Sequence, residues 1–344
     1  MKIKILLTSA GGGLAPEFLR LFKNIKGYNI ITFGVDKILK TSSKNFADFF
    51  YKVSGGKSKK FITEIKKISK NNKINLIIPG SDEDALNLSK NKKLIENKIT
   101  KIACVKYETL KILSDKEKTY NYLKKNNIEI PEFKIAKTKN ALLKNINYFI
   151  KKYKEVVIKP ARSRGGRNVF IIRKSFNKEI SRNNGREIEL GFRIFLKNFN
   201  KYKVNFYPII VMEKLKTPTF DFDMLCFNGK LISGISRKRI NPSVPNDGHI
   251  IQHDEKLYKI GKKIAKLFNL HWLYDCDFML DKFNNPKIIE INPRMSGSAS
   301  VSICAGIPLL ENLIKIYLNK KLNSKRLKGK VKVIPSISLF KQKI

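Results

Sequence analysis

Strand-length and helix-length segments alternate through the first third of the chain, and this alternation limits the possible folds more than any other feature. It predicts a parallel, doubly wound sheet, in which ligands bind at the carboxyl ends of the strands. Ser9–Gly13, Asp36 and Gly80–Asp84 would then lie on one rim of that sheet. The predicted strands are Ile3–Thr8, Ile30–Val35, Leu76–Pro79 and Ile102–Val105, and the predicted helices are Leu14–Lys26 and Phe61–Lys70.

The rest of the chain is patterned differently, and we predict a domain boundary near residue 110. A helix over Asp115–Asn126 leads to a second α/β unit that begins at Phe133, and strands dominate from Tyr207 onward. The polar stretch Arg173–Val204 shows no period and carries no predicted element. The other predicted elements are helices Asn140–Lys152, Asp254–Asn269 and Leu309–Asn319, and strands Val156–Lys159, Asn168–Ile172, Tyr207–Lys214, Phe220–Phe227 and Lys230–Arg239.

Two apolar runs, at 274–280 and 287–294, flank a turn and predict a hairpin that carries polar residues. Glu290 and Asn292 are two apart, so in a strand they share a face, and the paired strand can bring Asp277 beside them. Two carboxylates and an amide oxygen suit Mg²⁺ with bound phosphates. The alternative is a hairpin with one solvated polar face.

A lysine ends an apolar strand at Lys159, where it must leave the core or meet an anion. The loop that follows, Ala161–Arg167, contains adjacent glycines and three arginines, which suit phosphate. A basic turn with a snorkelling lysine is the alternative. The strand Ile209–Leu215 can offer its backbone and the Glu213 carboxylate to an adenine edge, although a strand end that meets water has the same pattern.

The chain has 344 residues and a net charge of +43, which ordinarily suggests nucleic acid. Its lysines are spread along the whole sequence, so we expect a solvated basic surface with only salt-sensitive binding to polyanions. The hydrophobic fraction of 42% argues against disorder, and no apolar run reaches the roughly 18 residues of a membrane helix. Four dispersed cysteines indicate buried thiols and a cytoplasmic location.

The order of these motifs resembles the ATP-grasp superfamily. The segment Ile289–Ser298 is similar to the branch of carbamoyl-phosphate synthetase large-subunit halves and biotin carboxylase, and Ser9–Gly13 is similar to the start of that branch's pre-ATP-grasp domain. The resemblance implies an α/β chain with an N-terminal parallel, doubly wound pre-ATP-grasp domain at 1–110. An ATP-grasp fold of two α+β subdomains would follow, the lid at 111–206 and the metal and nucleotide subdomain at 207–344.

The resemblance also implies roles for the residues that share the family's motifs. Those for ATP are Lys116, Lys159, Arg164, Gly165, Gly166, Glu213, Lys214, Leu215 and Asp221, with Asp223 as the alternative to Asp221 near the ribose. Those for two divalent cations, Mg²⁺ or Mn²⁺, are Asp277, Glu290 and Asn292. Those for catalysis are Lys159, Arg239 and Arg294. In these roles residues 164–166 form a lid over the phosphates, Glu213 faces the adenine amine, and Arg294 meets a carboxylate or acyl-phosphate.

The implied reaction is ATP-dependent ligation, in which a small-molecule carboxylate forms an acyl-phosphate that an amine, or a thiol, then attacks. The implied partners are these substrates and, as one assembly, a second copy of the chain. Arg237 and Arg239 share a strand face and are expected to reach the phosphates or the acceptor, unless that face is solvated. His249 is a candidate for proton transfer from the amine, whereas a zinc site with His253 is not expected.

Other functions remain open on the sequence alone. An enzyme that phosphorylates bicarbonate or carbamate is one, and a basic polyanion-binding protein on a degenerate ATP fold is another. A dinucleotide oxidoreductase is disfavoured, because the Gly-x-Gly-x-x-Gly spacing is absent. The acceptor pocket is expected at Gly11–Gly13, Ser81–Glu83 and Ser296–Ser298. The acidic residues there would suit an ammonium group, or they simply begin a helix.

Overall fold

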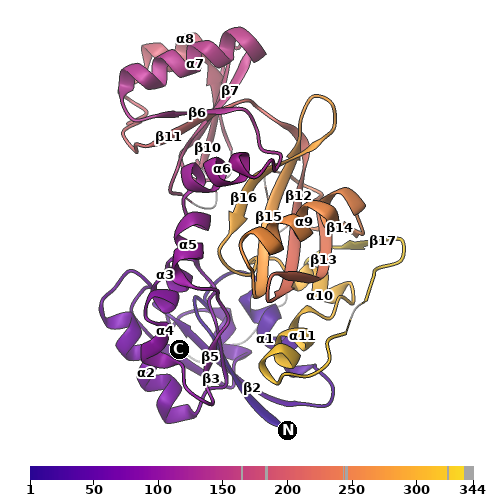
Figure 1. Cartoon of the computed structure of the whole chain (residues 1–344). Helices are drawn as coiled ribbons and strands as arrows, with labels where there is room; N and C mark the ends of the chain where they lie inside the picture. The colour runs from indigo at the N-terminus through magenta and orange to yellow at the C-terminus, as the bar shows by residue number, and fades with distance from the viewer. Residues whose placement is uncertain (164–165, 183–184, 243, 245–246, 324, 337–344) are drawn as a thin grey trace.

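The computed structural model describes residues 1–344 except 164–165, 183–184, 243, 245–246, 324 and 337–344. Its strands form a five-stranded sheet and two six-stranded sheets. The second sheet and its helices make up one end of the molecule, whereas the first and third sheets lie together toward the other (Figure 1). The predicted α/β class, with a parallel N-terminal sheet followed by two α+β units, is therefore confirmed.

The first sheet is parallel throughout and has the order β3-β2-β1-β4-β5. Its elements alternate as the sequence predicts, although β5 is shorter than the predicted strand and β3 and α3 were not predicted. The elements are β1 (Lys2–Leu7), α1 (Ala15–Lys23), β2 (Asn29–Asp36), the 3₁₀ turn η1 (Ser42–Asn45), β3 (Phe49–Lys52), α2 (Lys60–Asn72), β4 (Leu76–Ile78), α3 (Asp82–Lys90), α4 (Lys92–Ile95) and β5 (Lys101–Ile102).

Two helices lead to the second sheet, which has the order β6-β11-β7-β8-β10-β9. Only β8 and β10 pair in parallel. Two strands and a helix, β9, β10 and α8, occupy the stretch where no element was predicted. The elements are α5 (Tyr107–Leu113), α6 (Lys116–Lys125), β6 (Phe133–Ala136), α7 (Lys139–Tyr153), β7 (Glu155–Pro160), β8 (Val169–Arg173), β9 (Glu179–Arg182), β10 (Glu187–Gly191), α8 (Phe192–Lys197) and β11 (Ile209–Met212).

The third sheet is antiparallel and has the order β16-β15-β12-β13-β14-β17. The predicted hairpin is present, and its pairing sets Asp277 opposite Glu290. His249 is buried and begins β14. The elements are β12 (Lys216–Phe227), β13 (Lys230–Arg239), β14 (His249–Gln252), α9 (Glu255–Leu267), β15 (Trp272–Leu280), β16 (Pro286–Asn292), α10 (Ser300–Cys304), α11 (Leu309–Tyr317) and β17 (Lys330–Val333).

The hydrophobic core divides the three sheets into two groups. Residues of the first and third sheets form one continuous cluster, and the second sheet has a cluster of its own under α7 and α8. The first and third sheets are also joined by polar contacts, since the hydroxyl of Tyr274 accepts a hydrogen bond from the backbone N–H of Val105 at 2.9 Å. The second sheet is therefore the part that is least tied to the rest.

The chain crosses between the second sheet and the others in two short segments, 126–132 and 213–215. These segments are bonded to each other at Glu132 and Glu213. The N–H of Glu213 donates to the Glu132 carbonyl at 3.1 Å, and the Glu213 carboxylate accepts from the N–H of Glu132 at 2.8 Å. Because β11 pairs with β6 and β7, the sheets divide after residue 212. The predicted subdomain boundary at 206/207 stays a prediction.

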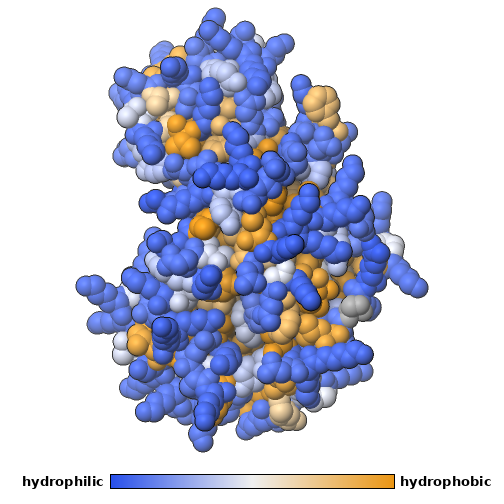
Figure 2. All heavy atoms as spheres, viewed as in Figure 1, coloured by the Kyte–Doolittle hydropathy of each residue, from blue (hydrophilic) through white to orange (hydrophobic). Residues whose placement is uncertain are grey.

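The visible surface is mostly hydrophilic (Figure 2), as the net charge of +43 requires. None of the helices in the described part of the chain combines the length and the apolar character that a membrane-spanning helix needs.

Candidate active site

A cavity of about 1030 Å³ lies among the three sheets and is lined by residues from each of them. Most of the predicted site residues line it, although they come from distant parts of the chain. Arg164 and Gly165 lie outside the described residues, and Glu213 is not part of the lining. The predicted residues that line the cavity are Lys116, Lys159, Gly166, Lys214, Leu215, Asp221, Arg239, Asp277, Glu290, Asn292 and Arg294.

Two lysines line the cavity on the side of the second sheet, one from α6 and one from β7. Lys116, in the first turn of α6, places its Nζ 2.7 Å from Oε1 of Glu290. Lys159 is buried, and its Nζ donates to the Tyr120 hydroxyl at 3.0 Å and to the Ile289 carbonyl at 3.4 Å. Neutral oxygens therefore hold Lys159 at the cavity wall, and the expectation that it meets an anion stays a prediction.

This neutral environment changes the acidity of Lys159. Burial, and secondarily the nearby charge of Lys116, lower the pKa of Lys159 to about 7. The pKa of Glu290 is lowered instead, since the attraction of Lys116 and Lys159 outweighs the cost of burial. Near neutral pH this wall therefore holds an ionised carboxylate and an amine that can readily gain or lose its proton.

Three carboxylates gather on the wall formed by the third sheet. Asp221, Asp275 and Asp277 each offer an oxygen within 4.8 Å of the others. Oδ1 of Asp275 and Oδ1 of Asp277 are buried and have no hydrogen-bond partner among the described residues. Asn292 donates from Nδ2 to Asp275 at 2.9 Å. A hard oxygen cluster with unsatisfied buried atoms fits a divalent cation.

Burial also raises the pKa of Asp277, to about 7, and the neighbouring charges of Asp221 and Glu290 act in the same direction. The pKa of Asp275 is raised well above its usual range, first by burial and then by the charge of Asp277. These shifts follow from like charges crowded in a buried place, which a bound cation would relieve.

Arginines face this carboxylate cluster from β13. Arg239 lies 2.5 Å from Asp221 and 3.2 Å from Asp277. Arg237 is fully buried and donates to Asp223 at 2.8 Å and to Ser298 at 2.8 Å. The alternative of a solvated face is therefore wrong for both arginines, because β13 turns this face inward. Of the two aspartates considered near the ribose, Asp221 lines the cavity.

His249 lies beside the same cluster. It is fully buried, with Nε2 3.1 Å from Asp221 and 3.2 Å from Nη1 of Arg237. Its Nδ1 has no hydrogen-bond partner among the described residues. His253 contacts Glu255 and Arg326 instead, on the exposed side.

Arg294 lines the main cavity and contacts the acidic first turn of α3. Nε of Arg294 lies 3.0 Å from Oδ1 of Asp82. Ser81 caps α3, its hydroxyl accepting from the N–H of Asp84 at 3.2 Å, and Asp82, Glu83 and Asp84 occupy the first helical turn. The helix-start interpretation of this acidic run is therefore confirmed.

The expected acceptor pocket is divided between two places. Gly12, Gly13 and Ser296–Ser298 line the main cavity, whereas Ser81 and Glu83 line a separate one.

The predicted adenine hinge, Glu213–Leu215, differs from the expectation at Glu213. The Glu213 carboxylate, expected to face an adenine amine, accepts from the backbone of Glu132 instead. Leu215 and Lys214 do line the cavity, and Lys214 forms an ion pair with Glu155 at 3.4 Å. Next to the cavity, the buried Met212 ends β11. Two residues of the predicted hinge thus line the cavity, whereas the Glu213 carboxylate bonds to the backbone of Glu132.

Sequence reasoning missed two residues of the site. Asp275 lies two positions before Asp277, so the period-two argument applied to Glu290 and Asn292 would have found it. Tyr120 lies four positions after Lys116 on α6, which places both on one helix face. Its hydroxyl donates to the Ile289 carbonyl at 2.7 Å and accepts from Lys159.

Three protein families match successive parts of the chain. Residues 5–103 match the family described as PylC-like, N-terminal domain. Residues 99–192 match sugar-transfer associated ATP-grasp, and residues 205–337 match ATP-grasp in the biosynthetic pathway with Ter operon. An uncharacterized protein of Methanocaldococcus jannaschii is 27% identical over 241 residues, which are 67% of this chain and 52% of that protein. The chain therefore spans about half the length of this relative.

Solved structures share the fold over nearly the whole chain. Biotin carboxylase from Campylobacter jejuni, as its β-γ-ATP complex, has a TM-score of 0.68 at 18% identity, covering 95% of this chain and 74% of that one. N5-carboxyaminoimidazole synthetase from Staphylococcus aureus, complexed with ADP, has a TM-score of 0.68 at 14% identity, covering 94% and 80%. L-amino acid ligase from Bacillus licheniformis has a TM-score of 0.62 at 13% identity, covering 92% and 74%.

Proposed function

This chain belongs to the ATP-grasp superfamily with a biotin carboxylase-like fold, and we propose that it is an ATP-dependent ligase. It joins a carboxylate to an amine through an acyl-phosphate, with ATP and Mg²⁺ as the nucleotide and metal. The observation that carries the proposal is the meeting of lysines, carboxylates and an arginine in one cavity between the sheets.

The charges suit the first step of such a reaction. A carboxylate must approach the γ-phosphate of ATP, and both are anions, so their repulsion has to be neutralised. Lys116 and Lys159 supply positive charge from one wall, and Arg294 and Arg239 supply it from the others. Phosphate next to Lys159 favours its ammonium form, which the depressed pKa otherwise disfavours.

The metal would be held by Asp277 and Glu290, with Asn292 beside them. Mn²⁺ would fit the same oxygen donors. When bound, the metal neutralises phosphate oxygens and orients them. Glu290 is paired with Lys116 at 2.7 Å here, so cation and phosphate binding would redistribute this contact. Asp221 and Asp275 add carboxylates to the same wall.

Arg294 is the proposed contact for the substrate carboxylate or the acyl-phosphate. It lines the same cavity as the carboxylate cluster and the Gly12–Gly13 loop, where an acceptor would enter. Its guanidinium is near Asp82, so an incoming carboxylate would compete with that residue. An amine is the proposed nucleophile, and a thiol is the alternative.

The test is nucleotide turnover by Glu290→Gln. The substitution removes a carboxylate at unchanged size, so ADP release in the presence of Mg²⁺ and a panel of carboxylates and amines should fall by about 10²–10³-fold. Glu17→Gln is the matched control, because Glu17 is on the surface in an ion pair with Arg20. Near wild-type turnover by Glu290→Gln would refute the metal assignment.

The same panel separates the two candidate reactions. A biotin carboxylase domain from Hydrogenobacter thermophilus was solved with MgADP and bicarbonate, at a TM-score of 0.67 and 16% identity over 95% of this chain and 72% of that one. ADP release that needs only bicarbonate would favour a bicarbonate-phosphorylating enzyme. Release that needs both a larger carboxylate and an amine would favour the ligase.

A further inference from the structure

A second cavity, of about 390 Å³, lies in the N-terminal part of the molecule. It is formed at the carboxyl edge of the parallel sheet, by Ser9 after β1, Asp36 at the end of β2, Val53–Ser58 after β3 and Ser81 after β4. Ser9 lines the main cavity as well, but Asp36 and Val53–Ser58 do not. This cavity is therefore separate from the place proposed for ATP.

Its carboxylates are fixed in position by neutral donors. The two oxygens of Asp36 accept hydrogen bonds from the backbone N–H groups of Gly11, at 2.8 Å, and Ile38, at 3.0 Å. Asp84 is nearly fully buried and accepts from the hydroxyls of Thr8 and Ser9, both at 2.7 Å. A carboxylate oxygen that holds one such bond still has a lone pair for a ligand hydroxyl.

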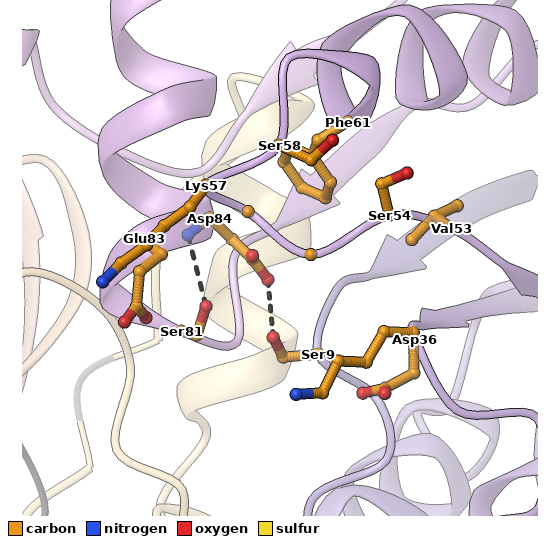
Figure 3. A pocket seen from close by; sticks show the side chains of 13 residues that line it. Ser9, Asp36, Val53, Ser54, Lys57, Ser58, Phe61, Ser81, Glu83 and Asp84 are labelled. Atoms are coloured by element: carbon orange, nitrogen blue, oxygen red, sulfur yellow. Dashed lines mark hydrogen bonds between the residues drawn. The ribbon is translucent and has the colours of Figure 1, made fainter.

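The other walls combine apolar surface with hydroxyl groups. Figure 3 shows Asp36 and Ser9 on one side of the space and Phe61 and Ser58 across it, with Glu83 and Lys57 extending together at another side. A flat apolar contact beside fixed carboxylates suits a ring that carries hydroxyls. The lining includes three carboxylates and two lysines, which disfavours a strongly anionic ligand.

We propose that this cavity binds a ring with a vicinal diol, whether the ribose of a nucleoside or a free sugar, and that the Asp36 carboxylate accepts both hydroxyls. In doubly wound sheets an acidic side chain after the second strand is placed to bind sugar hydroxyls, and Asp36 occupies that position. The strand order 3-2-1-4-5 puts the switch point of the sheet between β1 and β4, and Ser9 and Ser81, which follow these two strands, also line the cavity. The site goes beyond the ligase reaction, because it lies outside the main cavity.

Gly55 offers a place to add bulk at the cavity wall without a clash. A Cβ built at Gly55 meets no heavy atom within 4 Å, so a larger side chain there extends into open space. At the neighbouring Gly56 a Cβ would come within 2.3 Å of Oδ1 of Asp84, so that position cannot be changed without a clash. Because Gly55 lines the cavity, Gly55→Leu adds bulk at its wall, and Gly55→Ala is its matched control.

The experiment is calorimetric titration of the full chain with methyl β-D-ribofuranoside, and with its 2-deoxy analogue, which lacks the diol. The riboside should bind at least about tenfold more tightly than the deoxy analogue, since a hydrogen bond to a charged group is lost. Gly55→Leu and Asp36→Asn should weaken riboside binding by about tenfold or more, whereas Gly55→Ala and Glu17→Gln should leave it unchanged. Circular dichroism verifies that each variant is folded.

Two further ligands identify the source of the diol. Adenosine and methyl α-D-mannopyranoside both carry it, and only the part of their binding that Gly55→Leu abolishes is assigned to this cavity. Tighter binding of adenosine indicates a nucleoside, and tighter binding of the mannoside indicates a sugar. Equal binding of the riboside and its deoxy analogue, or wild-type binding by Asp36→Asn, would overturn the proposal. Neither outcome bears on ADP release, so the ligase proposal is tested separately.

Discussion

At the scale of single residues, the site is dominated by ionisable groups removed from water. Arg237 has no exposed surface and stands among Asp221, Asp223 and Asp275, at 3.5, 2.8 and 3.5 Å. A buried arginine is retained only where carboxylates and hydrogen bonds compensate for its lost hydration. Removing it takes the arginine partner away from Asp223 and Asp275, while Asp221 keeps Arg239.

Arg237→Ala should therefore destabilise the protein by about 3–5 kcal/mol. Urea unfolding of the variant and the wild type measures the difference. Arg326→Ala is the control, because Arg326 forms an exposed ion pair with Glu255 and such pairs contribute less than about 1 kcal/mol. If the two variants lose similar stability, the buried network does not hold the third sheet together.

Lys159 makes the stability depend on pH. Its pKa in the folded state, about 7, lies below the ordinary value of 10.5. Between these values the unfolded chain binds more protons, so this residue's contribution becomes more favourable as pH rises through that window and is least favourable below it. The largest slope from one group is about 1.4 kcal/mol per pH unit.

Lys159→Met should remove this slope. Without nucleotide, the advantage of the methionine variant in unfolding free energy should shrink as the pH is raised from about 7 to about 10. Urea titrations at several pH values give the comparison, with Lys111→Met on the surface as the control. A gap that does not change with pH would mean that Lys159 keeps an ordinary pKa in the folded protein.

At the scale of elements, the loop between β7 and β8 is the proposed lid. Arg162 and Arg167 lie in its described part, and Arg162 is largely exposed while its Nε pairs with Asp115 at 2.8 Å. ATP with Mg²⁺ should protect these arginines from trypsin, because a loop that contacts phosphate is less available to a protease. Lys159→Ala should weaken the protection, since the phosphate contact at the start of the loop is lost.

Mass spectrometry of the fragments locates each cut. The basic stretch from Lys320 to Lys332 serves as an internal control, because it does not line the main cavity. The same cleavage of the 161–167 loop with and without nucleotide would indicate that the loop is only a basic turn, as considered from the sequence.

The elements that sequence reasoning found, and those it missed, differ in their exposure. Strand β13 was predicted to the residue, because an Asn-Gly turn precedes it and both turn residues have positive φ. Strand β9 was missed, because all four of its side chains are exposed and leave no apolar period. Ion pairs such as Arg182 with Glu189, at 2.8 Å, hold that edge instead.

The site could be predicted only in part, because some of its contacts join residues that are far apart in the sequence. Local spacing placed Asp277, Glu290 and Asn292 on one face, and the strand pairing agrees. The contact between Lys116 and Glu290 spans 174 residues of sequence, so no local pattern could show it. The hydrogen bond between Glu213 and Glu132 could not be predicted either. It forms because the segments 126–132 and 213–215 lie side by side in the fold.

At the scale of the whole molecule, the charge of +43 governs how the protein meets polyanions. Binding to duplex DNA should be independent of sequence and should weaken by orders of magnitude between about 0.05 M and 0.2 M salt. Fluorescence anisotropy with two unrelated duplexes measures both effects. Tight binding to one defined sequence at about 0.15 M salt would revive a nucleic-acid function.

The bond between the two crossing segments also limits how the molecule can move. The two crossing segments define an axis between the second sheet and the rest of the molecule, and they are hydrogen-bonded to each other at Glu132 and Glu213. The second sheet, with its own core, can therefore turn about this short axis, but sliding or twisting would break the tie. Atoms near the axis sweep the smallest arcs. The proposed place of the nucleotide base, beside Leu215, is almost at the pivot, while β9, at the opposite edge of the sheet, would travel farther.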